Sequence, residues 1–153
     1  MIGLIQRVAS AQVAVGEEIV GRIGRGVLLL LAVQRGDSET TADRLLERVL
    51  GYRIFPDADG RMNLSLLEVR GELLIVSQFT LAADTRKGMR AGFSKAATPA
   101  EGERLYEYFL ERARGCGLTV GAGTYGAHME VSLTNDGPVT FWLEVSPNGE
   151  PAT

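Results

Sequence analysis

The stretch MEVSLTNDGPVTFWLEV, residues 129–145, sets the pattern from which we derive the fold. Hydrophobic and polar residues alternate in 129–133 and again in 140–145, which is typical of strands that bury one face. The Asn-Asp-Gly-Pro sequence of residues 135–138 has the composition of a turn. Asn and Asp bond back to their own backbone, Gly accepts positive φ, and Pro fixes φ. The stretch therefore predicts two strands joined by a turn.

The Gly137-Pro138 pair allows a second interpretation of this turn. Bonds that precede proline are the only peptide bonds with a realistic cis form, at about 5–6% in folded proteins. A cis Gly137-Pro138 would present two backbone carbonyls side by side, with no side chain on the glycine, as a rigid polar wall. A plain strand connector explains the same residues, and the motif alone does not exclude it.

Strand patterns recur through the rest of the chain. Residues 27–33 form a continuous apolar run, typical of a strand buried on both faces. Shorter strand-like segments occupy residues 2–8, 11–15, 19–23, 72–79 and 119–125. We interpret residues 11–15 and 19–23 as a hairpin.

Two helices are predicted between the groups of strands. The first starts at Asp37 or Ser38 and ends near Gly51. Its apolar stripe is Ala42, Leu45, Leu46, Val49 and Leu50. The second starts at a capping box with proline at its first position, residues 98–101. We therefore expect an α/β fold with mixed β-sheets and the two main helices packed on one side, a layered α/β/β single domain. This domain covers residues 1–145, and residues 146–153 form a flexible tail.

Composition excludes several classes of protein. With 153 residues and 45% hydrophobic residues, the chain has enough apolar surface for one compact core. A net charge of −3 argues against coating of nucleic acid through bulk charge. The single cysteine cannot form an internal disulfide, which suits a reducing cytoplasm. No signal peptide or membrane-length apolar run is present, so we expect a cytoplasmic protein without membrane contact.

The chain lacks the residues of several common catalytic sites. His128 is the only histidine and Cys116 the only cysteine, so zinc-site spacings are absent and we expect no metal and no cofactor. We interpret His128 as a half-buried strand residue. Residues 121–126 match G-x-G-x-x-G, but the next segment alternates like a strand, and a dinucleotide site needs a helix there.

Two polar segments are candidates for function. Ser77-Gln78-Phe79-Thr80 places polar side chains at the end of a buried strand, where they either converge on a ligand or bond locally to end the strand. A locally basic loop follows, and phosphates of a nucleic acid backbone are its candidate ligands, although a solvated loop is the commoner explanation of such charges. Its basic residues are Arg86, Lys87, Arg90 and Lys95.

Together, residues 77–80 and 135–140 give the chain a resemblance to the bacterial-type D-aminoacyl-tRNA deacylases, also called D-tyrosyl-tRNA deacylases. Residues 5–8 (IQRV), 62–65 (MNLS) and 84–88 (DTRKG) also resemble that family, and the resemblance runs from about residue 1 to residue 145. One departure follows Arg90, where the family usually has Pro-Ser-Phe and this chain has Ala-Gly-Phe. The added freedom of glycine puts the grip on tRNA or the substrate range in doubt.

The resemblance implies a homodimer that hydrolyses the ester between a D-amino acid and the 3′-terminal adenosine of tRNA. Because glycine has no side chain to exclude, we also expect glycyl-tRNA to be a substrate. In that family a cis Gly-Pro of one subunit enters the site of the other, which assigns the chiral filter to Gly137 and Pro138. The resemblance also makes Arg7 the residue that holds the Gly-Pro loop and Met129 a lining residue of the pocket. It assigns the ester and adenosine site to Ser77, Gln78, Phe79 and Thr80.

The residues favour hydrolysis without a covalent intermediate. A threonine hydroxyl with no adjacent base is a poor nucleophile, so Thr80 is less suited to attack than a positioned water. Backbone N–H groups near Phe79 and Thr80 would stabilise the oxyanion. Assistance by the ribose 2′-hydroxyl of the substrate is implied by the family alone. The alternatives are a tRNA 3′-end binding module without turnover, or a general small esterase that uses Thr80.

Overall fold

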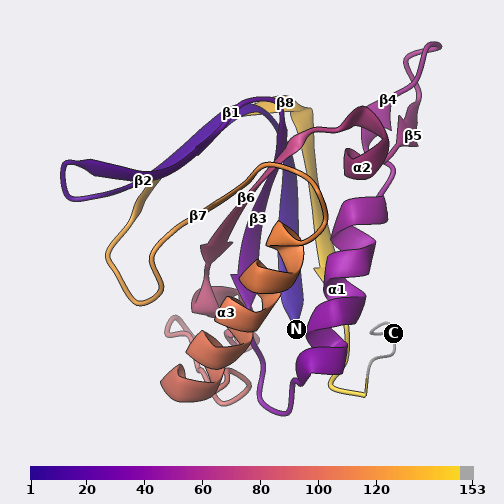
Figure 1. The fold of residues 1–153 in the computed structure, drawn as a ribbon. Coiled ribbons are helices and arrows are strands. Elements are labelled where there is room, and N and C mark those ends of the chain that lie inside the picture. Colours follow the sequence, from indigo (N-terminus) through magenta and orange to yellow (C-terminus); the bar gives the residue numbers. More distant parts are fainter. Residues whose placement is uncertain (149–153) are drawn as a thin grey trace.

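A computed structural model describes residues 1–148 of the chain (Figure 1). Its elements, in chain order, are β1 (Ile2–Val15), β2 (Glu18–Ile23), β3 (Gly26–Ala32), α1 (Glu39–Gly51), β4 (Phe55–Pro56), β5 (Met62–Leu64), α2 (Leu66–Val69), β6 (Glu72–Ser77), the 3-10 turn η1 (Phe79–Ala82), α3 (Pro99–Arg114), β7 (Val120–Ala122) and β8 (Glu130–Glu144). The predicted tail falls mostly on residues 149–153, which lie outside the described residues. No helix of the described chain is long and apolar enough to cross a membrane.

One mixed sheet dominates the molecule, with the strand order β2-β1-β3-β6-β7 and with β8 on the second edge of β1. The long strand β1 is antiparallel to β3 along its first half, to β2 along its second half, and to β8 along both halves. The strands β3, β6 and β7 are parallel. Because β2 also contacts β7, the upper part of the sheet curls until it nearly closes.

Helices α1 and α3 cover the same face of this sheet (Figure 1), which confirms the predicted fold class. Ser38 caps α1 in a capping box with Thr41, and the predicted apolar stripe of α1 is buried. Side chains of both helices form the main core with the odd-numbered residues of β3, among them Val27, Leu29 and Leu31. A second core fills the curled part of the sheet and contains Val8, Val13, Leu28, Leu74 and Val76.

The prediction of a turn at residues 135–138 is wrong. Strand β8 runs unbroken through these residues, and both of its halves pair with β1 instead of with each other. Gln6 pairs with Thr140 and Val8 pairs with Asn135, so Arg7 alone lies opposite residues 136–139. These four residues therefore form one large bulge in a single strand. Residues that favour turns also favour bulges, which explains why their composition misled the prediction.

Other boundaries differ from the prediction for local reasons. Residues 2–8 and 11–15 form one strand, because irregular pairing with β8 around Val8 and Ser10 does not end β1. The short helix α2 was not predicted, although Ser65 and Glu68 form a capping box at its start. Strand β6 ends at Ser77 instead of reaching residue 79, and β7 is shorter than the predicted segment 119–125. The capping box of α3 is half formed, since Thr98 accepts from the Glu101 backbone while the Glu101 carboxylate pairs with Arg104.

Candidate active site

A cavity of about 430 Å³ opens where β6 ends. The first turn of α3 and the segment between β7 and β8 form its other walls. Its lining includes Ser77, Gln78, Phe79, Tyr106, Tyr125 and Met129. A cavity that combines apolar and aromatic walls with a few polar groups is the usual form of a small-molecule site.

The end of β6 places Ser77 and Gln78 in the cavity wall. β6 is parallel to β3, and the Gln78 backbone N–H continues the pairing by donating to the Leu31 carbonyl at 2.8 Å. The chain then turns into η1, and the Gln78 side-chain amide donates to the Thr80 hydroxyl. Of the two alternatives that the sequence left open, the local bond is present at Gln78. Ser77 and Gln78 also line the cavity.

Phe79 and Thr80 differ from these two residues in their surroundings. The Phe79 side chain is 60% exposed and its ring lies 5.2 Å from the ring of Phe93, centroid to centroid. Thr80 is exposed and is not a lining residue of the cavity. Its hydroxyl accepts from an amide, and within residues 1–148 no carboxylate or imidazole bonds to it. Thr80 consequently has no base that would activate it as a nucleophile.

Two backbone donors at the start of η1 have no partner in the described chain. The Phe79 and Thr80 N–H groups donate to no atom of residues 1–148, while the next residue, Leu81, donates to the Gln78 carbonyl at 3.2 Å. Unpaired N–H groups at the start of a helical turn are suited to an oxygen that carries negative charge. Their position next to the lining residues Gln78 and Phe79 places this capacity at the cavity.

Arg7 and the bulge of β8 form a separate polar cluster. The Arg7 guanidinium donates from Nε to the Asp136 carbonyl at 2.9 Å and from Nη1 to the Ile54 carbonyl at 2.7 Å. The Gly137-Pro138 peptide bond is cis. The Asn135 side chain accepts from the Val139 backbone N–H at 2.7 Å and so closes the bulge from within. Arg7 is the only residue of β1 opposite this bulge.

Within one chain, the bulge lies far from the cavity. Ser77 shares its register with Leu31, Gly3 and Leu143 on successive strands, and Pro138 precedes Leu143 by five positions along β8. Strand spacings of about 4.8 Å and a rise of about 3.3 Å per residue put Pro138 roughly 20 Å from Ser77. The structure does not bring these two predicted parts of one site together in a single chain.

Met129 lines the cavity and is held by its neighbours. Its sulfur accepts a hydrogen bond from the Thr124 backbone N–H at 3.3 Å. His128 also lines the cavity, but it is exposed and lies in the segment that precedes β8. The prediction of a half-buried strand residue at this position is therefore wrong. No group of three or more His, Cys, Asp or Glu residues within the described chain could hold a metal ion.

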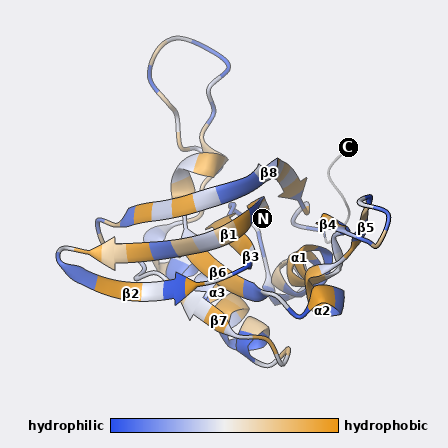
Figure 2. Cartoon of the chain, turned by 90° about the horizontal axis from the view of Figure 1, so that it is seen from above, coloured by the Kyte–Doolittle hydropathy of each residue, from blue (hydrophilic) through white to orange (hydrophobic). Residues whose placement is uncertain are grey.

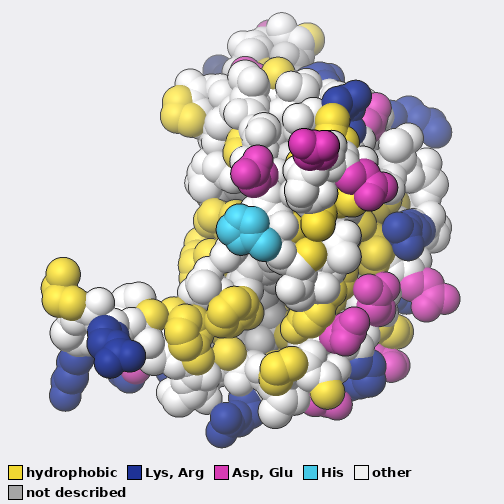
Figure 3. All heavy atoms as spheres, turned by 90° about the vertical axis from the view of Figure 1, so that its left-hand side faces the viewer, with side chains coloured by type: hydrophobic (Ala, Val, Ile, Leu, Met, Phe, Trp, Pro, Cys, Tyr) yellow, Lys and Arg dark blue, Asp and Glu magenta, His cyan; other side chains and the backbone are white. Residues whose placement is uncertain are grey.

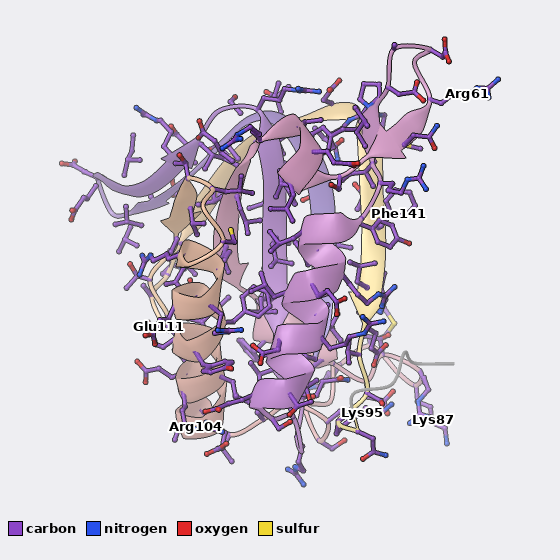
Figure 4. All side chains as sticks on the ribbon, turned by 45° about the vertical axis from the view of Figure 1, so that its right-hand side comes forward. Arg61, Lys87, Lys95, Arg104, Glu111 and Phe141 are labelled. Carbon is purple, nitrogen blue, oxygen red and sulfur yellow. The ribbon has the colours of Figure 1, made fainter. Side chains whose placement is uncertain are left out.

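The basic loop projects from the sheet face that no helix covers (Figure 2), and Lys and Arg side chains gather on it (Figure 3). Arg86 is bound to Asp84 through Nε at 2.9 Å and Nη2 at 2.6 Å, and these bonds hold the pKa of the Asp84 carboxyl well below its usual range. Lys87 and Lys95 lie at the end of the molecule opposite to Arg61 (Figure 4). Together with Arg90, they form no salt bridge within residues 1–148.

Gly92, where the chain departs from the family pattern, is fixed at the base of this loop. Its N–H donates to the Asp84 carbonyl at 3.0 Å, and its carbonyl accepts from the Asp84 N–H at 2.7 Å. This pair of bonds limits the freedom that a glycine would otherwise add.

A family model described as D-Tyr-tRNA(Tyr) deacylase matches residues 4–144. The chain belongs to this deacylase family. It is 60% identical over 148 residues to a D-aminoacyl-tRNA deacylase of Alkalilimnicola ehrlichii, an alignment that covers 97% of this chain and 99% of that deacylase. A D-aminoacyl-tRNA deacylase of an Enterobacter species is 59% identical over 145 residues, with 95% and 100% of the two chains covered.

Solved structures agree with this assignment of the deacylase fold. A structure named c-Myc DNA unwinding element binding protein superposes with a TM-score of 0.90 at 36% identity, over 95% of this chain and 99% of that one. A probable eukaryotic D-amino acid tRNA deacylase superposes with a TM-score of 0.77 at 20% identity, over 92% and 97% of the two chains. The family model and the curated relatives confirm the resemblance seen in the sequence motifs, together with the enzyme class, a deacylase that hydrolyses ester bonds.

Proposed function

We propose that this deacylase hydrolyses D-aminoacyl-tRNA and glycyl-tRNA, and that Gly137-Pro138 of a second copy excludes L-amino acids from the cavity. The observation that carries the proposal is the separation of roughly 20 Å between Pro138 and Ser77 in one chain, which follows from the strand register. If the bulge and the cavity act on one substrate, a second copy must supply one of them.

The uncovered face of the sheet is a suitable surface for that second copy. Gly3 and Ile5 of β1 face the helices, so Leu4 faces the other way, and its partners across the sheet are Leu30 and Trp142. Trp142 is 50% exposed. Large apolar side chains that gather on an exposed face mark an interaction surface in soluble proteins. The basic loop projects from this same face (Figure 2) and could reach across the junction between two copies.

The cavity supports hydrolysis by a positioned water. Water adds to the ester carbonyl, the Phe79 and Thr80 N–H groups hold the oxyanion, and the 3′-hydroxyl of the terminal adenosine leaves with a proton. One such donor is worth about 2.7–4 kcal/mol of barrier. The resemblance to the family implies that the ribose 2′-hydroxyl of the substrate assists the proton transfer. Thr80 has no base bonded to it in the described chain, so we assign it no part in this transfer.

Selectivity in this proposal comes from repulsion. A pocket that prefers one apolar group discriminates by only about 1–3 kcal/mol. A rigid wall that collides with every L side chain rejects all of them, while hydrogen at the α-carbon fits. Glycyl-tRNA is therefore a substrate, because glycine has no side chain to collide.

The tRNA reaches the cavity along the basic loop. Lys87, Arg90 and Lys95 have no salt-bridge partner within residues 1–148 and contact its phosphates. Arg86 contributes less, since Asp84 already holds its guanidinium.

The decisive test is the hydrolysis of matched D- and L-tyrosyl-tRNA by the purified protein, with Pro138→Ala as the comparison. We expect loss of the D ester alone with the natural chain, and loss of both esters with the variant. Loss of both esters with the natural chain would favour the general esterase. Turnover of neither ester, with tRNA still bound, would favour the binding module. Sedimentation that showed an active monomer would contradict the role of a second copy.

A further inference from the structure

Two glycines make room for side chains of the cavity wall. A Cβ atom on Gly102 would lie 2.5 Å from the Tyr125 hydroxyl oxygen and 3.5 Å from Cζ of the same ring. A Cβ atom on Gly123 would lie 2.6 Å from the Met129 sulfur. Neither glycine has positive φ, so glycine is needed at these positions for space and not for backbone conformation. Tyr125 and Met129 thus occupy positions that are open only because the facing residue is glycine.

Tyr125 is fixed at the cavity by its neighbours as well as by Gly102. Its ring lies 5.6 Å from the ring of Tyr106, centroid to centroid, at an interplanar angle of 41°. Tyr106 is itself anchored, since it is buried and donates to the Ile75 carbonyl at 3.0 Å. The Tyr125 hydroxyl points to the first turn of α3, where it donates to the Pro99 carbonyl at 3.4 Å. Burial raises the pKa of Tyr125, which keeps the phenol neutral.

This geometry leaves the Tyr125 oxygen free as an acceptor. Its one proton goes to Pro99, so its lone pairs can accept a hydrogen bond from a ligand. Tyr125 lines the cavity together with the apolar side chains of Met129 and Val131, and its oxygen lies next to two further lining residues, Pro99 and Gly102. A polar atom in an apolar wall fixes the orientation of whatever binds there.

We propose that Tyr125 is a specificity-determining residue of this deacylase: its hydroxyl, seated in the space that Gly102 leaves open, accepts a hydrogen bond from the 3′-terminal nucleoside in the cavity. The proposal rests on the proposed function, since it takes the cavity to hold the aminoacylated end of tRNA. Tyr125 positions the nucleoside and takes no part in the bond cleavage.

A double-mutant cycle of Tyr125→Phe and Gly102→Ala tests the proposal. Adenosine is the probe for binding, D-tyrosyl-tRNA is the substrate, and thermal unfolding reports on the fold. Tyr108→Phe is the matched control, because Tyr108 lies on α3, the helix that also carries Gly102, and its hydroxyl bonds to Asp43 at 3.0 Å, away from the cavity.

With Tyr125→Phe we expect the affinity for adenosine to fall and KM to rise by about 2- to 12-fold, the range for one lost hydrogen bond, with kcat unchanged. Gly102→Ala alone pushes the Tyr125 ring from its place, so its loss of affinity is larger. In the double variant the clash is gone, and affinity returns to the level of Tyr125→Phe. Because alanine favours a helix over glycine, the double variant melts about 2–4 °C above Tyr125→Phe. Tyr108→Phe leaves both the adenosine affinity and KM unchanged.

Other results overturn the proposal. Full affinity in Tyr125→Phe shows that the hydroxyl does not touch the ligand, and wild-type behaviour of Gly102→Ala shows that glycine does not seat the ring. A fall in kcat with unchanged KM assigns Tyr125 to the chemistry instead. No binding of adenosine by the natural chain also overturns it. If the adenosine affinities of the variants behave as expected but the natural chain does not hydrolyse D-tyrosyl-tRNA, the proposed function fails while Tyr125 keeps its role in nucleoside binding.

Discussion

Arg7 ties the bulge of β8 to a loop that lies far away in sequence. Its guanidinium bonds to the Asp136 carbonyl at 2.9 Å and to the Ile54 carbonyl at 2.7 Å, and its side chain is only 12% exposed. The bulge residue Asp136 also approaches Arg7 through its carboxylate at 3.5 Å. One side chain thus sets the position of Gly137-Pro138 relative to the rest of the sheet.

Arg7→Met should destabilise the fold and weaken chiral selection together. Each hydrogen bond from a charged group contributes about 1.5–3 kcal/mol, and the methionine side chain fills the space but makes neither bond. We expect a melting temperature several degrees lower and measurable hydrolysis of L-tyrosyl-tRNA. Arg22→Met is the control, because Arg22 is exposed and its guanidinium bonds, within residues 1–148, only to the Gln12 side chain. Unchanged rejection of the L ester in Arg7→Met would show that the bulge keeps its position without Arg7.

Gly137→Ala should lower the free energy of unfolding more than alanine does at a glycine whose Cβ position is unobstructed. Gly137 has φ of 139°, and a Cβ there would lie 2.7 Å from Val139 Cγ2. Strain of this kind costs about 1–3 kcal/mol. Gly16→Ala is the matched control, since Gly16 also has positive φ but nothing within 4 Å of its Cβ position. Denaturant unfolding of the two variants should show the larger loss of free energy for Gly137→Ala.

Thr80→Ala should remain an active deacylase. Thr80 accepts from the Gln78 amide and has no base beside it in the described chain, so the variant loses one hydrogen bond and no nucleophile. We expect kcat on D-tyrosyl-tRNA to fall by less than about 10-fold, in line with the worth of one hydrogen bond. Complete loss of turnover with tRNA binding intact would contradict this and would indicate covalent catalysis by Thr80.

The parts of the fold that the sequence predicts are those with a local cause. The Ser38 cap and the stripe of α1 depend on residues within one helix, and the apolar run that became β3 needs only its length and composition. The composition of residues 135–138 predicts a turn, whereas residues 136–139 form a bulge, because the result depends on which strand each flanking run pairs with. Pairing with β1 is a contact between residues far apart in the sequence, and the residues near the bulge do not indicate it.

The residues of the candidate site also fall into two groups: those with a local signal in the sequence, and those that only the folded chain brings together. The polar end of β6 stood out in the sequence, since Ser77 and Gln78 follow a buried run. Tyr125 and Gly102 did not, because α3 and the segment after β7 meet β6 only in the folded chain. The glycines of residues 121–126 were the one available signal. We interpreted them only as a rejected phosphate motif, whereas Gly123 makes room for Met129.

Within the basic loop, Arg90→Gln and Arg86→Gln should affect tRNA binding unequally. Each phosphate contact contributes about 0.7–0.9 to the slope of log affinity against log salt concentration. Arg86 is already bound to Asp84 at 2.6 Å, while Arg90 forms no salt bridge within residues 1–148. We therefore expect Arg90→Gln to reduce the slope by nearly one contact and Arg86→Gln to reduce it less. Equal slopes for the two variants and the natural chain would rule out phosphate contact by this loop.

Asp37→Asn should strongly destabilise the fold, and the loss of stability should depend on pH. The Met1 ammonium lies 2.8 Å from Asp37, both side chains are fully buried, and the ammonium also donates to the Val145 carbonyl at 2.7 Å. Removal of one partner from a buried ion pair costs about 3–5 kcal/mol. Asp43→Asn is the control, because the exposed pair of Asp43 with Arg112 is worth about 0–1 kcal/mol.

The pH dependence of this variant follows from the Met1 amine. Burial lowers the pKa of this group from its ordinary value of 8.0, and Asp37 opposes that shift, so Asp37→Asn lowers the pKa further. Between the two pKa values the unfolded variant binds more protons than the folded one, and its stability therefore rises with pH. We expect the free energy of unfolding of Asp37→Asn to recover in part over the pH range that leads up to 8.0, the ordinary pKa of the amine. A deficit that stays constant across this range would show that the amine does not titrate in the folded variant.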